Sequence, residues 1–317
     1  MSSAASRAPH AAAASPASFA DRLVRAVRAL GHPLCLGLDP HLASLPPLFA
    51  RGSMSPGDER TAEAVEAFFA AVIDRAAGRV AVVKPQIAFF EQLGWRGMRA
   101  LERLCARART AGLLVLLDAK RGDIGSTAEG YAAAYLGAEA ALPADALTVN
   151  PYLGFDTLEP FVRTASANGR GLFVLVRTSN PGSADLQDRE VAGEPVFGLV
   201  ARGLAPSELA LRGPETGWSS LGVVVGATWP EQARRVREAL PRALFLVPGY
   251  GAQGGSAEAA VVSFQRGPAG LEGGIVNSSR AILFPEAARG ATDAARWERA
   301  IDDALARAVD ELAAAVR

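Results

Sequence analysis

The sequence predicts an α/β fold, a (β/α)8 (TIM) barrel, from three observations. Eight short apolar runs recur along the chain, amphipathic helical patterns fill most of the gaps, and polar residues follow most of the runs. Runs that are apolar throughout are typical of parallel strands buried on both faces, which need helical crossovers. The runs are residues 34–38, 80–83, 113–117, 146–149, 171–176, 222–226, 243–247 and 273–276.

The chain length of 317 residues fits either one barrel or two smaller domains. We expect an Ala/Ser/Pro-rich disordered tail over residues 1–17 and a single barrel over residues 18–317. A doubly wound open sheet is the alternative, but no G-x-G-x-x-G motif follows the first run. The barrel is therefore the preferred prediction.

Helix signals lie between the strand-like runs. Ser18–Asp21 forms a capping box that opens a short helix, which ends at Gly31 and Pro33. Further amphipathic patterns predict helices, and one long connection predicts an active-site loop with a helix. These helices are expected over residues 59–77, 92–111 and 290–316 and after an N-cap at Thr228, and the long connection spans residues 178–221.

Composition limits the class of partner. Lys+Arg and Asp+Glu both number 33, so no basic excess argues for binding to nucleic acid or an anionic membrane. No apolar run is long enough to span a membrane or to serve as a secretory signal, so we expect a cytoplasmic protein with a small-molecule partner. Cys35 and Cys105 are expected to be buried thiols. The three histidines all lie within the first 41 residues, which disfavours a histidine-rich metal site or triad.

Lysine is rare, because only Lys84 and Lys120 occur among 33 basic residues. A GC-rich genome that favours Arg is one explanation, but Lys also supplies a compact ammonium that can deliver a proton. Both lysines follow strand-like runs, where a barrel places its active site. The polar residues at these ends are Asp39, Lys84, Asp118, Lys120, Asn150, Arg177, Thr178, Ser179, Asn277, Ser278, Ser279 and Arg280.

The segment after the third run concentrates polar residues. In an extended backbone Asp118 and Lys120 point to the same side, and Asp123 and Thr127 share the first turn of the next helix. Asp123 also suits a helix N-cap. A Lys between carboxylates keeps its proton, which favours proton donation over Schiff-base attack. A separate phosphate site is predicted from the Gly-rich segment 247–255 and Arg280.

The motif D-x-K-x-x-D-I-x-x-T occurs as Asp118, Lys120, Asp123, Ile124 and Thr127. Over about residues 30–290 the chain resembles orotidine 5'-phosphate decarboxylases, particularly the longer bacterial (type 2) form. The other segments that carry the resemblance are GLDP at 37–40, VVKPQ at 82–86, GFDTLEPF at 154–161, VVVGAT at 223–228, VPGYGAQGG at 247–255 and NSSR at 277–280.

The resemblance implies decarboxylation of orotidine 5'-monophosphate to UMP, the last step of pyrimidine synthesis, without a cofactor or metal. Lys120 would protonate C6 of the pyrimidine, and Asp118 would lie against the departing carboxylate. Lys84 would pair with Asp118 and the ribose, and Asp123 would complete the Lys–Asp array. The other substrate-binding residues implied are Asp39 for the ribose, Ser179 for the pyrimidine, and Gln253 and Arg280 for the phosphate.

In the family, the residues that match Asp123 and Thr127 reach the neighbouring subunit's site, which implies a homodimer with shared sites. Three other functions compete with this reading. In a class I aldolase, Lys120 would form a Schiff base. In a metal-assisted sugar-phosphate decarboxylase, the acids would hold Mg²⁺. A non-catalytic nucleotide-binding protein would tolerate loss of the lysines. No fused phosphoribosyltransferase domain is expected.

Overall fold

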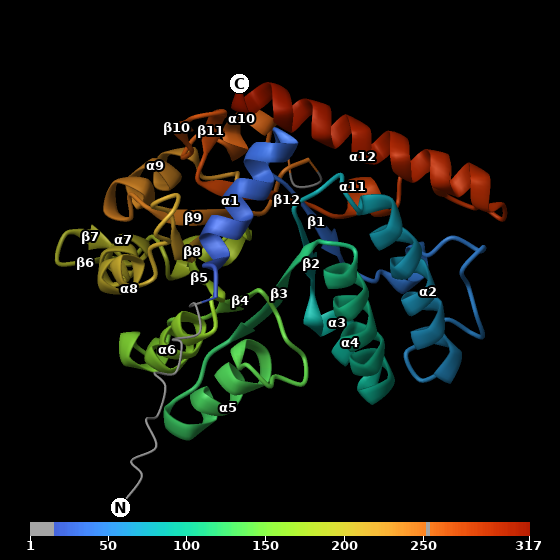
Figure 1. Ribbon diagram of the computed structural model, residues 1–317, viewed down its shortest axis with the longest axis horizontal. Coiled ribbons are helices and arrows are strands. Elements are labelled where there is room, and N and C mark those ends of the chain that lie inside the picture. The colour runs from blue at the N-terminus through green and yellow to red at the C-terminus, as the bar shows by residue number, and fades with distance from the viewer. Residues whose placement is uncertain (1–15, 252–253) are drawn as a thin grey trace, which may run out of the picture.

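The computed structural model describes residues 16–251 and 254–317, and in it the eight expected strands form a closed barrel. They are β1 (Leu34–Leu38), β2 (Val82–Pro85), β3 (Leu114–Arg121), β4 (Ala146–Val149), β5 (Gly171–Arg177), β8 (Ser219–Val225), β9 (Ala243–Val247) and β12 (Gly274–Ser278). The order around the barrel is β1-β12-β9-β8-β5-β4-β3-β2, and all neighbours pair in parallel (Figure 1). The prediction of a (β/α)8 barrel is confirmed. Residues 1–15 of the predicted tail lie outside the described residues.

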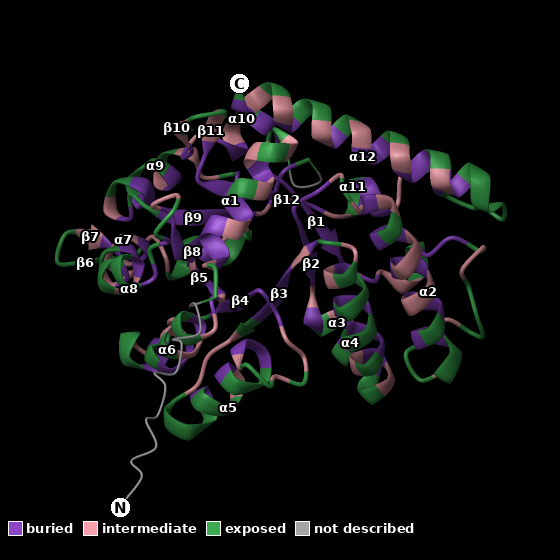
Figure 2. Ribbon diagram, in the orientation of Figure 1, coloured by how far each residue is buried: buried purple, intermediate pink, exposed green. Residues whose placement is uncertain are grey.

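The barrel interior and the layer between strands and helices are both apolar, which explains why the strands lack polar alternation. Inward-facing side chains such as Cys35, Leu116 and Ile275 form one buried cluster. Outward-facing side chains such as Leu36 and Leu117 pack into a larger cluster with the helices. Figure 2 shows the strands buried at the centre and the helices exposed along their outer faces.

Helix α1 (Phe19–Leu30) packs against the barrel near the N-terminal ends of the strands. Ser18 Oγ accepts a hydrogen bond from the Asp21 N–H at 3.1 Å, and Gly31 ends the helix with a left-handed φ of 76°. The Phe19 ring meets the edge of Phe173, near the start of β5, at 6.1 Å between centroids. Because α1 occupies this end, the opposite ends of the strands are left for a site.

The other helices alternate with the strands, but two predicted starts were wrong. No side chain of the described residues caps α9, which begins at Pro230 after Trp229, so Thr228 is not its cap. The last helix begins at residue 294 and not 290, because the Asp293 carboxylate caps it. The helices are α2 (Glu59–Ala76), α3 (Ile87–Glu91), α4 (Gly94–Thr110), α5 (Gly125–Leu136), α6 (Glu159–Ala167), α7 (Val196–Gly203), α8 (Ala205–Ala210), α9 (Pro230–Ala239), α10 (Ala257–Ala260), α11 (Arg280–Leu283) and α12 (Ala294–Val316).

The long connection between β5 and β8 contains more structure than the expected loop and helix. A 3₁₀ turn at Pro181–Asp185 precedes a hairpin of β6 (Glu190–Val191) and β7 (Glu194–Pro195), and α7 and α8 follow. A second hairpin, β10 (Gln265–Gly267) with β11 (Gly270–Glu272), lies before β12.

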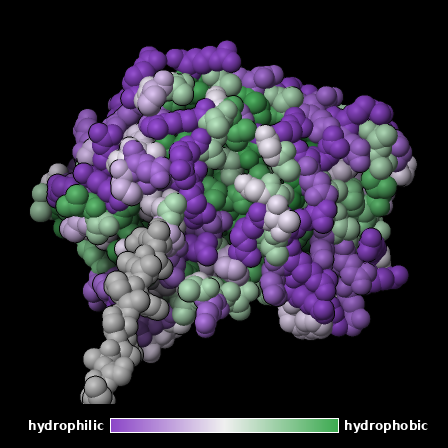
Figure 3. Space-filling model, in the orientation of Figure 1, coloured by the Kyte–Doolittle hydropathy of each residue, from purple (hydrophilic) through white to green (hydrophobic). Residues whose placement is uncertain are grey.

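One face of the molecule is seen in Figure 3, in the orientation of Figure 1. Figure 3 shows hydrophilic side chains over much of this face, with apolar patches between them. No helix in the described ranges has both the length and the apolar character needed to cross a membrane. Cys35 and Cys105 are buried free thiols, as expected.

Candidate active site

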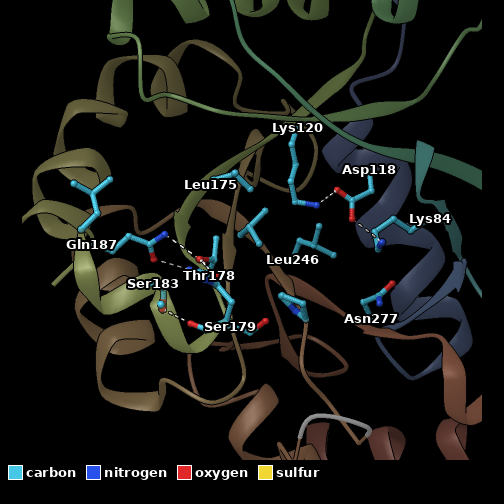
Figure 4. A pocket seen from close by; sticks show the side chains of 15 residues that line it. Lys84, Asp118, Lys120, Leu175, Thr178, Ser179, Ser183, Gln187, Leu246 and Asn277 are labelled. Atoms are coloured by element: carbon cyan, nitrogen blue, oxygen red, sulfur yellow. Dashed lines mark hydrogen bonds and ion pairs between the residues drawn. The ribbon is translucent and has the colours of Figure 1, made fainter. Parts of the chain in front are cut away.

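A cavity of about 530 Å³ opens at the C-terminal ends of the barrel strands (Figure 4). Its walls come from the ends of β2, β3, β5, β8, β9 and β12 and from the segment that follows β5. The lining residues are Lys84, Asp118, Lys120, Leu175, Thr178, Ser179, Asn180, Gly182, Ser183, Leu186, Gln187, Val224, Leu246, Pro248 and Asn277.

Three charged side chains form a chain of contacts in this cavity, as Figure 4 shows. Lys84 Nζ lies 2.8 Å from Asp118 Oδ2, and Lys120 Nζ lies 2.6 Å from Asp118 Oδ1. Lys84 and Asp118 are buried, with 5% and 7% of their surfaces exposed, while the Lys120 side chain is 45% exposed. One carboxylate is therefore clamped between two ammonium groups, and one of these reaches the open cavity.

The cluster keeps its charges. Burial alone would raise the pKa of Asp118, but the ammonium groups of Lys84 and Lys120 outweigh it and hold the pKa well below its usual range. Burial would also lower the pKa of Lys84, but the carboxylates of Asp118 and Asp39 keep it above its usual value. The ionised carboxylate of Asp118 therefore has an amine nitrogen from a lysine within 3 Å of each of its oxygens.

The geometry that joins Asp118 to Lys120 differs from the sequence expectation. We expected an extended backbone to point both side chains to the same side. In the structure Lys120 has a left-handed backbone with a φ of 49°, which non-glycine residues rarely adopt. Both residues lie in β3 and their side chains meet, as expected, but the backbone at Lys120 itself is not extended.

Asp123 and Thr127 lie apart from the cluster. Asp123 precedes α5 and accepts a hydrogen bond from the neighbouring Ile124 N–H at 2.8 Å, so it does not share the first helical turn with Thr127 as expected. It does not cap the helix either, since Ile124 occupies the cap position. Neither residue lines the cavity of its own chain, and Thr127 is exposed.

Ser179 lines the cavity, whereas Asp39 is not among the lining residues. Asp39 follows β1, and its Oδ2 accepts a hydrogen bond of 2.5 Å from Ser279 Oγ. Asp39 Oδ1 is buried and has no hydrogen-bond partner among the residues that the structure describes. Ser179 lines the cavity wall opposite the lysines.

The residues expected at the phosphate are less fully described. Arg280 is exposed at the start of α11, beyond β12, and does not line the cavity. Gln253 lies outside the described residues. Tyr250, in the Gly-rich segment, donates a hydrogen bond of 2.5 Å to Glu311 on α12.

Arg177 anchors the segment that forms the Ser179 wall. Its guanidinium is fully buried, donates to Ser183 Oγ, lies 2.8 Å from Asp188 Oδ2 and stacks 3.9 Å from the Trp229 ring centroid. An arginine fork that binds several groups at once holds a loop in one geometry. The buried contacts of Arg177 therefore hold the segment that carries Ser179 in place.

Sequence reasoning missed Thr148 and Gln187, whereas Asn277 was among the polar residues expected at the strand ends. Thr148 on β4 donates a hydrogen bond of 3.0 Å to Asp118 Oδ1. Gln187 and Asn277 line the cavity, and Asn277 Oδ1 lies 3.8 Å from the Cys35 thiol that donates to it. A polar residue inside an apolar run was the available signal for Thr148, whereas nothing in the spacing pointed to Gln187. No group of three or more His, Cys, Asp or Glu within residues 16–251 and 254–317 is arranged to hold a metal ion.

Comparison with known proteins agrees with the site. The sequence matches the orotidine 5'-phosphate decarboxylase / HUMPS family over residues 32–295. A Rhodopirellula baltica protein named orotidine 5'-phosphate decarboxylase is 43% identical over 302 residues, which cover 93% of this chain and 99% of that protein. The solved structure of Leishmania donovani OMP decarboxylase has a TM-score of 0.70 and 32% identity, and the match covers 93% of this chain and 98% of that one.

The structure of Leishmania donovani UMP synthase also matches, with a TM-score of 0.71 and 33% identity over 94% of this chain and 57% of that one. The family match includes every strand end that contributes to the cavity. Because the family match spans residues 32–295 and a relative is 43% identical over 93% of this chain, the chain belongs to the orotidine 5'-phosphate decarboxylase / HUMPS family.

Proposed function

We propose that this chain decarboxylates orotidine 5'-monophosphate to UMP, the step that forms UMP in pyrimidine biosynthesis, without a cofactor. The observation that carries the proposal is the clamped carboxylate of Asp118 between Lys84 and Lys120 at the cavity. The family match and the relative named for this reaction support it.

The proposed mechanism uses Lys120 as the proton donor. Decarboxylation breaks the bond from C6 of the pyrimidine to the carboxylate carbon, CO2 departs, and the electron pair stays on C6. An ammonium held nearby stabilises this developing charge and then transfers its proton to C6. Asp118 would lie against the departing carboxylate and hold Lys120, with Lys84 as its buried counter-ion. Solvent would then reprotonate Lys120.

Asp39 and Ser179 are the proposed contacts to the ribose and the pyrimidine. Within the described part of the chain Asp39 Oδ1 has no partner, so it has the capacity to accept a hydrogen bond from a ribose hydroxyl. Ser179 faces the cavity with a hydroxyl that can both donate to and accept from a pyrimidine edge.

The direct test is the loss of absorbance when the purified protein is mixed with orotidine 5'-monophosphate in EDTA. We expect turnover that is unaffected by the chelator. Activity lost in EDTA would favour a metal-assisted decarboxylase. If the folded protein shows no turnover but is trapped by borohydride with a carbonyl substrate, an aldolase is favoured instead.

Arg280→Ala tests the phosphate assignment. We expect kcat/KM to fall by about 10- to 100-fold, the effect of removing a charged hydrogen-bond donor. Steady-state kinetics measure the change. Arg289→Ala is the matched control, because Arg289 is an exposed arginine that pairs with Glu286 outside the cavity. An unchanged kcat/KM in folded Arg280→Ala would remove Arg280 from the phosphate site.

We propose a homodimer with shared sites, formed at the ends of β3 and β4. Ile124 is 62% exposed there, and Tyr152, Leu153 and Phe155 are 75%, 51% and 47% exposed. Large apolar side chains gathered at one place mark an interaction surface. A second copy docked there would cover these side chains and bring Asp123 and Thr127, which do not line their own cavity, toward the partner's cavity.

Ile124→Glu is expected to produce monomers, because it places a charge in the proposed apolar interface. Sedimentation would measure the mass of the Ile124→Glu variant, and we expect its turnover to fall as the dimer is lost. Leu209→Glu is the matched control, since Leu209 is also 62% exposed but lies on α8, which precedes the start of β8 at the other end of the barrel. A monomeric wild-type protein with full activity would exclude shared sites.

We also propose that residues 18–317 act as one domain and that the chain is of the longer bacterial (type 2) form. Support for the subtype comes from the connection between β5 and β8, which holds the hairpin of β6 and β7 and the two helices α7 and α8.

A further inference from the structure

The third strand is irregular at the point where it carries the catalytic cluster. Leu117 pairs with Leu147 of β4, but the next pair along is Arg121 with Val149. Three residues of β3 therefore lie opposite Thr148 alone. This bulge includes the left-handed backbone of Lys120, the residue proposed to donate the proton. Bulges of this kind redirect a side chain and leave backbone N–H groups without ladder partners.

The hydroxyl of Thr148 supplies the missing partner for these backbone N–H groups. Its Oγ1 accepts hydrogen bonds from the backbone N–H groups of Ala119 and Lys120, both at 2.9 Å. It donates its own proton to Asp118 Oδ1 at 3.0 Å. A hydroxyl has one donor and two acceptor positions, so all three are used. Thr148 is 1% exposed, and no ordinary surface role accounts for the arrangement.

We infer that Thr148 is a positioning residue for the proposed decarboxylation, because its hydroxyl holds both the Lys120 backbone and the Asp118 carboxylate. This inference rests on the proposed function. Lys120 has a long side chain that is 45% exposed, so its backbone must be held if its ammonium is to reach one place. Without the hydroxyl, the strained turn loses two hydrogen bonds and Asp118 Oδ1 is left with Lys120 only.

The same hydroxyl therefore links the Asp118 carboxylate to the backbone of Lys120. Asp118 Oδ2 is held by Lys84, and Oδ1 is held by Lys120 and Thr148. With both oxygens engaged, the carboxylate plane cannot rotate freely. Thr148 does not line the cavity, so we expect its effect on the reaction to pass through the groups that it positions.

The experiment compares Thr148→Val with Thr148→Ser. Valine keeps the branched shape and removes the hydroxyl, while serine keeps the hydroxyl. We expect Thr148→Val to lower kcat by about 100-fold, the loss produced by a small misplacement of reacting groups, with KM and the Kd of UMP changed by less than about threefold. Thr148→Ser is expected to restore most of kcat.

Thr61→Val is the matched control. Thr61 is fully buried on α2, and its hydroxyl donates to the Ser55 carbonyl at 2.7 Å, far along the chain from the cluster. The Thr61→Val substitution removes a buried threonine hydroxyl at a residue that does not line the cavity, so the kcat of this variant should equal that of the wild-type protein. A crystal structure of Thr148→Val supplies a readout that does not depend on activity: φ of residue 120 is expected to leave the left-handed region.

Three results would overturn the inference: a folded Thr148→Val with kcat within about threefold of wild type, a Thr148→Ser as slow as Thr148→Val, or a UMP Kd weakened in proportion to kcat. If Thr148→Val does not fold, Thr148→Cys carries the test, because a thiol is a weak donor and acceptor, and its kcat should lie well below that of Thr148→Ser. Failure of the wild-type protein to turn over substrate would instead overturn the proposed function, which separates the two.

Discussion

Lys120→Ala is expected to abolish turnover, with kcat reduced by more than about 10⁴-fold, while UMP still binds. A positioned general acid contributes about 10²- to 10⁴-fold, and a preorganised charge at the reacting atom contributes a further factor of about 10²- to 10³-fold. Lys120 would supply both. Binding should persist, because the remaining cavity wall, from Thr178 to Gln187 and across to Asn277, is unchanged. Steady-state kinetics and calorimetric titration with UMP would measure the two effects.

Lys120→Arg separates proton transfer from charge. Arginine keeps the positive charge beside Asp118 but holds its proton at any ordinary pH, so it cannot act as the donor. We expect this variant to bind UMP and to remain inactive. Substantial residual turnover in Lys120→Ala would exclude Lys120 as the proton donor, and an active Lys120→Arg would reduce its role to electrostatic stabilisation.

Asp118→Asn is expected to lower both activity and stability. Removing the carboxylate leaves the buried ammonium of Lys84 facing that of Lys120, and breaking a buried ion pair on one side costs about 3 kcal/mol in the free energy of unfolding. Turnover should also fall, because the group that holds Lys120 is lost. Asp303→Asn, an exposed position on α12, is the control and should change stability by less than about 0.5 kcal/mol.

The stability difference should depend on pH in one direction. The pKa of Asp118 is lowered in the folded protein, so its stabilisation is present above its unfolded pKa of about 4 and is lost as the pH falls toward the lowered folded value. Denaturant unfolding of the wild-type protein and Asp118→Asn should therefore differ most near neutral pH and converge below about pH 4. A difference that is constant with pH would contradict the assigned ionisation of Asp118.

The fold could be predicted because its determinants are local. All eight apolar runs form barrel strands. Helix α1 begins after Ser18, whose side chain caps it, and ends at Gly31, which adopts a left-handed backbone. Errors occurred where two local signals competed. Thr228 looked like a cap, yet α9 begins after Trp229, and Asp293 set the start of α12 four residues beyond the expected position. Cap residues recur close together in sequence, and packing selects among them.

The identity of the charged residues could also be predicted, because two rare lysines and Asp118 follow buried strands. Their geometry could not. The contact between Asp118 and Lys120 depends on a left-handed turn, and Thr148 from the neighbouring strand holds that turn. The spacing of residues in the sequence describes one strand at a time. The register between β3 and β4 decides that the Thr148 hydroxyl meets the N–H of Lys120.

The barrel, the residues at its strand ends and the family motif could be read from the amino-acid sequence alone, because periodicity and chemistry are properties of short segments. The way in which those residues meet depends on the folded chain. In the folded chain Asp118 lies between two lysines, Thr148 donates to its carboxylate, Gln187 lines the cavity and Asp123 does not. These outcomes depend on closure of the barrel, which brings together side chains that are far apart along the chain.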